Sequence, residues 1–175
     1  MIKEILLIGW ELITVQMPLY LNIWIALLLL SSVLEGVFKS IQQKRPLGNA
    51  LLIAVIEGLI VTVVALGITA FGIRLIDWIL PGHIEPFSRE NTVLFSVIIV
   101  TAALVVDVIV RGVTKNKQPI VFFSVVIMAI VVAFAFLFGM VAVFNSAISV
   151  SLVVLLIISV SLSLLLGTVY YTKTN

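Results

Sequence analysis

The feature that most constrains this chain is a charge-free run from Ile120 to Phe144, "IVFFSVVIMAIVVAFAFLFGMVAVF". An α-helix needs about 20 apolar residues to cross the ~30 Å of hydrocarbon in a bilayer, and this run is longer. Other apolar runs precede and follow it. Of all residues 63% are hydrophobic and 10% are charged, whereas soluble domains carry about 25% charged residues. We therefore predict an all-α polytopic membrane protein that binds no cofactor and has the lipid bilayer as its solvent.

Five transmembrane helices are predicted, at about residues 18–38, 47–71, 92–110, 120–144 and 148–171, within one domain covering 18–175. The segments "KSIQQKRPLG", "LPGHIEPFSRE" and "RGVTKNKQP" separate them, and each contains proline, which breaks a helix interior. The last two spans are joined only by "FNSA", which predicts a tight antiparallel hairpin.

Residues 1–17, "MIKEILLIGWELITVQM", precede the first span. Glu4 and Glu11 and the lack of a small-residue cleavage site argue against a secretory signal peptide. With Trp10 among aliphatic residues, the segment is typical of an amphipathic helix lying at the membrane interface. The alternative is an extension of the first span into one long tilted helix.

The distribution of basic residues predicts the orientation, because short cytoplasmic loops are rich in lysine and arginine. Five spans place seven of the ten bases on one side of the membrane: Lys39, Lys44, Arg45, Arg111, Lys115, Lys117 and Lys173. The other side has Lys3, Arg74 and Arg89, accompanied by acids. We expect a multi-pass protein of the cell membrane with its N-terminus outside and its C-terminus in the cytoplasm.

Three pairs of opposite charges fall near the ends of spans. Glu35 precedes Lys39 by four residues and Asp107 precedes Arg111 by four, so each acid can pair with its base along the helix. Both pairs are predicted at the cytoplasmic ends of their spans. Arg74 and Asp77, three residues apart, are predicted to pair at the outer interface, where "GIRLIDWIL" extends the second helix beyond the hydrocarbon.

Glu57 lies inside the second span, in "NALLIAVIEGLIVT". It follows Pro46 by about eleven residues, or about 16 Å of helix, which places it near the middle of the bilayer. No base lies one turn away on its own helix. Three interpretations remain open: a protonated carboxyl bonded to a neighbouring helix, an assembly contact with another subunit, or a proton or cation site in a transport path.

Small residues predict where helices pack closely. Gly36 and Gly58, in the similar motifs "VLEGV" and "VIEGL", allow close helix approach beside each glutamate. We expect the two glutamates at different depths, and attribute the likeness of the motifs to chance. Small and hydroxyl residues in the second and fifth spans predict that these two helices are the buried ones.

No catalytic motif is present, so we expect a protein that is not an enzyme. The chain has no cysteine, and its one histidine, His83, with Glu85 two residues on, is a weak candidate for holding a metal. The function we favour is a non-catalytic accessory or assembly subunit of a larger membrane complex. Its partners are other membrane subunits or further copies of itself, with no nucleic acid. The alternative is a small oligomeric transporter or channel that uses Glu57 as its proton or cation site.

Overall fold

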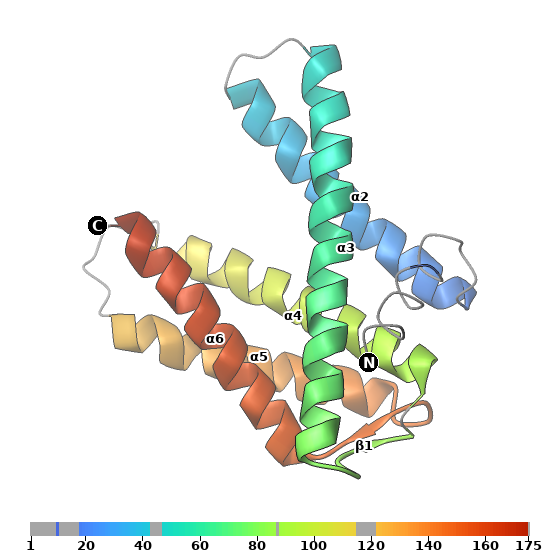
Figure 1. The fold of residues 1–175 in the computed structure, drawn as a ribbon. Helices are drawn as coiled ribbons and strands as arrows, with labels where there is room; N and C mark the ends of the chain where they lie inside the picture. Colours follow the sequence, from blue (N-terminus) through green and yellow to red (C-terminus); the bar gives the residue numbers. More distant parts are fainter. Residues whose placement is uncertain (1–9, 11–17, 43–46, 87, 115–121, 175) are drawn as a thin grey trace. The chain divides into compact units, whose positions relative to one another are not determined.

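The computed structural model describes residues 10, 18–42, 47–86, 88–114 and 122–174. This part of the chain folds into five helices and two very short strands (Figure 1). The helices are α2 (Leu19–Gln42), α3 (Leu47–Ile79), α4 (Arg89–Thr114), α5 (Phe122–Val143) and α6 (Leu152–Thr174). The strands are β1 (Ile84–Glu85) and β2 (Ser149–Val150).

Four of these helices, α2 to α5, are long and apolar enough to cross a membrane. The apolar stretch of α6 is shorter, Leu152–Thr168, although the whole helix has 23 residues, or about 34 Å of length. The prediction of an all-α polytopic membrane protein is confirmed. The predicted interfacial helix at 1–17 lies outside the described residues except for Trp10, whose side chain is exposed.

α3 continues to Ile79, as the segment "GIRLIDWIL" predicted, and its 33 residues make about 50 Å of helix, longer than the ~30 Å of hydrocarbon. The start of the last helix differs from the sequence prediction for a local reason. α6 begins at Leu152 and not near residue 148, because Ser149 and Val150 form a strand. Ser151 then caps the helix by accepting the backbone N–H of Val154 at 3.4 Å.

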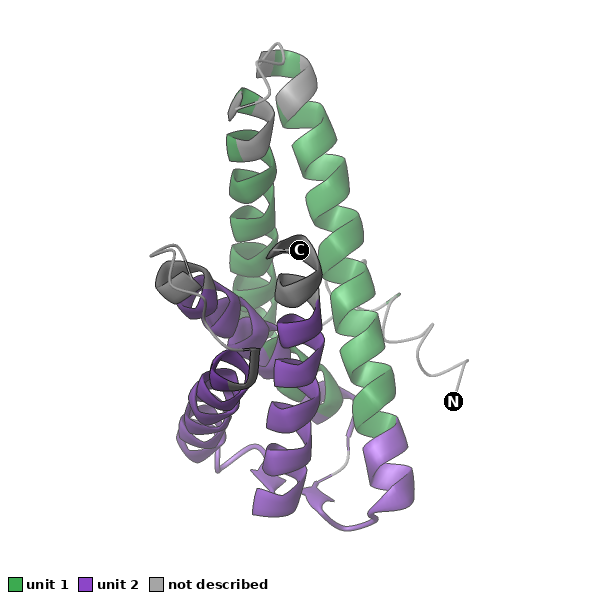
Figure 2. Ribbon diagram, turned by 90° about the vertical axis from the view of Figure 1, so that its left-hand side faces the viewer, with its two compact units in different colours: residues 1–74, 92–97 green, residues 75–91, 98–175 purple. Residues whose placement is uncertain are grey.

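The chain divides into two compact units, residues 1–74 with 92–97 and residues 75–91 with 98–175 (Figure 2). In unit 1, α2 and α3 form an antiparallel hairpin whose contact is made by small residues. A Cβ atom added at Gly36 would lie 2.9 Å from the Cβ of Ala54, and one added at Gly58 would lie 3.0 Å from Cγ2 of Val33. The helices therefore touch backbone to backbone, as the two glycines predicted.

Hydroxyl groups continue this contact beyond the glycines. The Oγ of Ser32 lies 3.5 Å from the Oγ1 of Thr62, which is buried. Ala54, Gly58 and Thr62 are each four residues apart, so they form one stripe along the buried side of α3. The same spacing separates Ser32 from Gly36 on α2.

The Ser32–Thr62 contact gives a direct test of the hairpin. The chain has no natural cysteine, so we expect the double variant Ser32→Cys/Thr62→Cys to form an intramolecular disulfide when membranes are treated with a lipid-soluble oxidant. The disulfide should be visible as a shift in non-reducing electrophoresis. Ser31 is exposed and turned about 100° from Ser32 around α2, so Ser31→Cys/Thr62→Cys is the matched control and should not cross-link. Equal cross-linking of both pairs would contradict this packing.

In unit 2, α5 and α6 pack along each other and α4 packs on α5. Val106 and Val110 of α4 meet Val125, Ala129 and Ala133 of α5 in one buried cluster. The buried side of α6 carries Ser159 and Ser163, whose hydroxyls donate to backbone carbonyls four residues earlier at 2.7 Å each. Its exposed side carries leucine, isoleucine and valine side chains together with Ser161 and Thr168. This distribution suits a helix whose outer side meets lipid, because lipid solvates aliphatic side chains and small hydroxyl residues favour close packing.

The prediction that the second and fifth spans are the buried helices is wrong for the second. Of the α3 span only 22% is buried, against 56% of the α4 span Arg89–Val110. In α4 every residue from Asn91 to Ile99 is buried. Small residues mark only one stripe of α3, and the opposite side of that helix is exposed. In α4 bulky side chains such as Leu94 and Phe95 fill the core instead.

Candidate functional site: the glutamate layer of the first hairpin

The hairpin contact fixes the relative depth of Glu35 and Glu57. Gly36 of α2 faces Ala54 of α3, and Gly58 of α3 faces Val33 of α2. The two helices are therefore antiparallel, with residue numbers that increase along α2 opposite residue numbers that decrease along α3. Glu35 precedes Gly36 by one residue on α2, and Glu57 follows Ala54 by three residues on α3. Because the helices are antiparallel, both steps lead away from the Gly36–Ala54 contact in the same direction along the hairpin. At about 1.5 Å per residue the two positions differ by about 3 Å along the hairpin. The expectation of different depths is therefore wrong, and both acids belong to one layer, which we call the glutamate layer.

The glutamate layer lies within the apolar part of the hairpin. Glu57 is six residues into the span Leu51–Ile79, or about 9 Å from its start. Glu35 lies three residues before Phe38, the last residue of the apolar span of α2, or about 4.5 Å from that end. Both acids are thus in the half of the hairpin nearer the α2–α3 connection.

The side chain of Glu57 is exposed on the outside of the described structure. Among the described residues no hydrogen bond or ion pair reaches its carboxylate. It belongs to an exposed side of α3 that begins before it, at Leu52 and Ile56, and continues after it at helical spacing. We call the part from Glu57 onward the α3 face: Glu57, Ile60, Val61, Val64, Ile68 and Phe71.

The three predicted ion pairs stay predictions. Glu35 and Asp107 are half-buried, while the side chains of Lys39 and Arg111 lie outside the described residues. Glu35 and Asp107 each make an interaction of their own. Arg74 and Asp77 are half-buried and three residues apart on α3, as the sequence placed them. Glu57, by contrast with the half-buried Glu35, Asp77 and Asp107, is exposed and lies inside the apolar part of a helix.

The α3–α4 and α5–α6 connections form a second polar region, in unit 2. Ile84 pairs with Val150 and Glu85 with Ser149 in an antiparallel two-stranded sheet. Pro81 and Gly82 make the turn before β1, and Gly82 has φ +80°, a conformation that glycine adopts without strain. We call the paired connections the β clip.

Hydrogen bonds of His83 hold the β clip to α6. Its Nδ1 lies 2.9 Å from the Oγ of Ser151, and its carbonyl accepts the backbone N–H of Ser151 at 2.9 Å. Among the described residues no three histidine, aspartate or glutamate side chains are grouped to hold a metal ion. The histidine that sequence reasoning treated as a weak metal candidate therefore bonds to a helix cap. The two-residue strands were missed because such short strands have no detectable alternation of apolar and polar residues.

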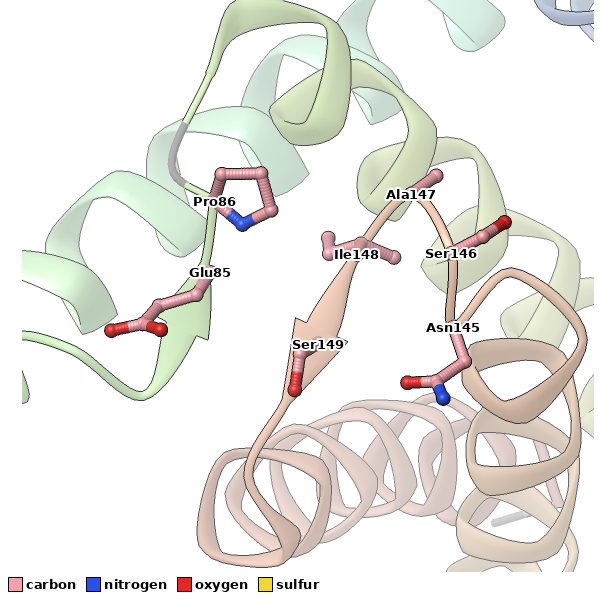
Figure 3. Close-up of a pocket in the computed structure, with 7 residues that line it drawn as sticks. All are labelled: Glu85, Pro86, Asn145, Ser146, Ala147, Ile148 and Ser149. Atoms are coloured by element: carbon pink, nitrogen blue, oxygen red, sulfur yellow. The ribbon is translucent and has the colours of Figure 1, made fainter.

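A pocket of about 430 Å³ opens beside the β clip. Glu85 and Pro86 line one side, and residues 145–149 of the α5–α6 connection line the other (Figure 3). In the figure the carboxylate of Glu85 extends away from the amide of Asn145. The polar groups of the pocket therefore do not converge on one point. In a specific ligand site they would converge.

Loss of the Ser151 hydroxyl is expected to weaken the β clip. Ser151→Ala removes both the cap of α6 and the bond to His83, and loss of a serine cap costs about 0.5–2 kcal/mol. We expect a lower midpoint in thermal unfolding of the detergent-purified protein. Ser146→Ala, at an exposed position of the same connection, is the control and should leave the midpoint unchanged. An unchanged midpoint in Ser151→Ala would mean that these bonds do not contribute to stability.

The fold thus defines the class: an all-α polytopic membrane protein with an exposed glutamate on the apolar part of one span. No protein-family model, curated protein or solved structure matches the chain. Its function has to be inferred from its own residues.

Proposed function

We propose that this chain is a non-catalytic subunit of a larger membrane complex and that it assembles through the α3 face. The observation that carries the proposal is the exposure of Glu57 on the apolar part of a membrane-spanning helix. A charged residue on a lipid-exposed helix is unfavourable, by about 2.5–3.5 kcal/mol at the bilayer centre on insertion scales and by less toward the interface. Burial of the carboxyl against a polar group of another helix removes part of this cost.

The α2–α3 hairpin supports the proposal because it excludes an inward position for Glu57. The side of α3 that carries Ala54 and Gly58 is already in contact with α2. Rotation of α3 to bring Glu57 inward would replace this close glycine contact with a long side chain. The partner of Glu57 must then come from outside the hairpin.

The β clip supports the alternating direction of α4 and α5 as consecutive spans. Pairing of Ile84 with Val150 brings the α3–α4 and α5–α6 connections to the same side of the membrane. The pairing is the same whichever side is cytoplasmic, so the proposed orientation rests on the distribution of lysine and arginine.

The test is the size of the particle that carries the protein in mild detergent extracts of its own membranes. We expect the wild-type chain in a particle larger than itself, with a foreign membrane subunit in fixed stoichiometry. Val64→Trp, in the middle of the α3 face, should shift the chain to the size of the isolated subunit. Leu165→Trp on α6, where Leu165 is 68% exposed, is the matched control and should leave the particle intact.

One outcome would replace the proposal with the transport alternative. The chain would purify as a homo-oligomer without other subunits, conduct ions or protons in liposomes, and lose that flux in Glu57→Gln. If flux is absent, or is unchanged in Glu57→Gln, the transport role of this residue is excluded.

A further inference from the structure

We infer that the α3 face binds a transmembrane helix of a different polypeptide, one that carries a lysine or arginine in the cytoplasmic half of the membrane. The inference rests on the proposed assembly function and specifies the chemistry of the partner. It follows from the position of the two glutamates on the hairpin, from their depth, and from where the chain has its own bases.

The glutamates lie on the same flank of the hairpin. Each comes directly before the glycine at the helix contact, Glu35 before Gly36 and Glu57 before Gly58. One residue turns about 100° around an α-helix. Because α2 and α3 are antiparallel, the residue that precedes the contact residue lies on the same side of the hairpin in both helices. A helix that packs against this flank therefore meets the side of α3 that bears Glu57 and the flank of α2 that bears Glu35.

The depth of the glutamate layer limits which base can reach Glu57. A further copy of this chain, inserted in the same orientation, would bring its own Glu57 to the same depth and place carboxyl beside carboxyl. On the α2–α3 hairpin of that copy, the helical base nearest in depth is Lys39, which lies three residues beyond the Gly36 contact and thus about 9 Å closer to the α2–α3 connection than Glu57. Arg74 follows Glu57 by seventeen residues, or about 25 Å toward the other side.

Within the described part of its α2–α3 hairpin, a second copy therefore offers no lysine or arginine at this depth. A lysine or arginine of another polypeptide, buried opposite Glu57, would instead neutralise the charge of the carboxylate. Charge interactions are strong in the low dielectric of the membrane interior, so this pairing would be favoured over a pair of carboxylates. The remaining α3 face, aliphatic apart from Phe71, would pack against the apolar part of the same partner helix.

The experiment uses defined probe helices co-expressed with the full chain. Each probe is a single leucine-rich span with one lysine, placed about seven residues from the cytoplasmic end of its apolar stretch. Two control probes carry the lysine at the mirrored depth near the outer end, or leucine throughout. We expect the matched-lysine probe to co-purify about tenfold or more above both controls, as expected for a close charge pair in an interface.

Variants of the chain separate charge from shape. Glu57→Gln should remove the preference for the matched-lysine probe. Val61 lies one turn further along the α3 face and is 58% exposed, so Glu57→Leu/Val61→Glu should prefer a probe whose lysine is one turn deeper. Equal capture of all probes by the wild-type chain would overturn the inference, as would association between two copies of the chain that depends on Glu57. Neither result would affect the proposed function if the native particle still falls apart in Val64→Trp.

Discussion

Replacing Glu57 with leucine is expected to have opposite effects on the isolated chain and on its assembly. The isolated chain should insert and fold better, because a carboxyl group leaves the apolar part of α3, a change worth about 2–3 kcal/mol on insertion scales. The complex with its partner should be lost, because the polar anchor of the α3 face is gone. Removal of a buried partner in a charge pair costs about 2–5 kcal/mol of binding.

The change in membrane insertion and the change in assembly can both be measured on Glu57→Leu. Insertion of an isolated α3 segment into microsomes reports the first, and the particle size of the full chain in membrane extracts reports the second. Glu57→Gln keeps a polar side chain of nearly the same shape and should fall between wild type and Glu57→Leu in both assays. If Glu57→Leu instead lowers the thermal stability of the isolated chain, the carboxyl serves the chain's own fold and the assembly role is wrong.

Placing a leucine at Gly36 is expected to separate α2 from α3. The first added atom would lie 2.9 Å from the Cβ and 3.2 Å from the Cα of Ala54, and a backbone atom cannot move aside without moving the helix. Overpacking of a close contact costs about 1–3 kcal/mol even where side chains can adjust. We expect the upper end of this range, measured as a loss of unfolding free energy in a reversible denaturant titration of the protein in mixed micelles.

The chain contains a matched control for this variant. Gly67 lies on α3 and is half-buried, yet a Cβ atom added there meets no atom of another residue within 4 Å. Gly67→Leu should therefore leave the unfolding free energy close to that of wild type, and an added aliphatic side chain is favourable in lipid. Similar losses in Gly36→Leu and Gly67→Leu would mean that leucine at any glycine is harmful, and that the hairpin contact has no special role.

The sequence predicted the helical membrane fold because long apolar runs leave few other structures for a backbone that must satisfy its own hydrogen bonds in lipid. It also predicted the close approach at Gly36 and Gly58, since small residues permit it. It did not predict which residue each glycine contacts, because hydropathy gives the length of each span but not the register between two helices. That register depends on which side chains interlock, here Ala54 with Gly36 and Val33 with Gly58.

The same limit explains the errors about burial and about the β clip. In lipid, apolar side chains suit both the inside and the outside of the bundle, so α4, the most buried span, has no compositional signal to mark it. Strands of two residues, such as Ser149–Val150, depend on a partner far away in the sequence. Glu57 was found from the sequence alone because a charge within an apolar run is rare and costly. Its exposure required the structure.

Single-cysteine spin labels on the α3 face give the most direct test of the assembly role, and the cysteine-free chain allows them without background. Labels at Val64 and Ile68 report contact with lipid-dissolved oxygen, and a label at Leu165 on the exposed side of α6 gives the reference value for lipid exposure. In the native assembly we expect the Val64 and Ile68 labels to be protected relative to Leu165, and to lose this protection in Glu57→Leu. Labels at Val64 and Ile68 that are as accessible to oxygen as the Leu165 label would show lipid, and no partner, against α3.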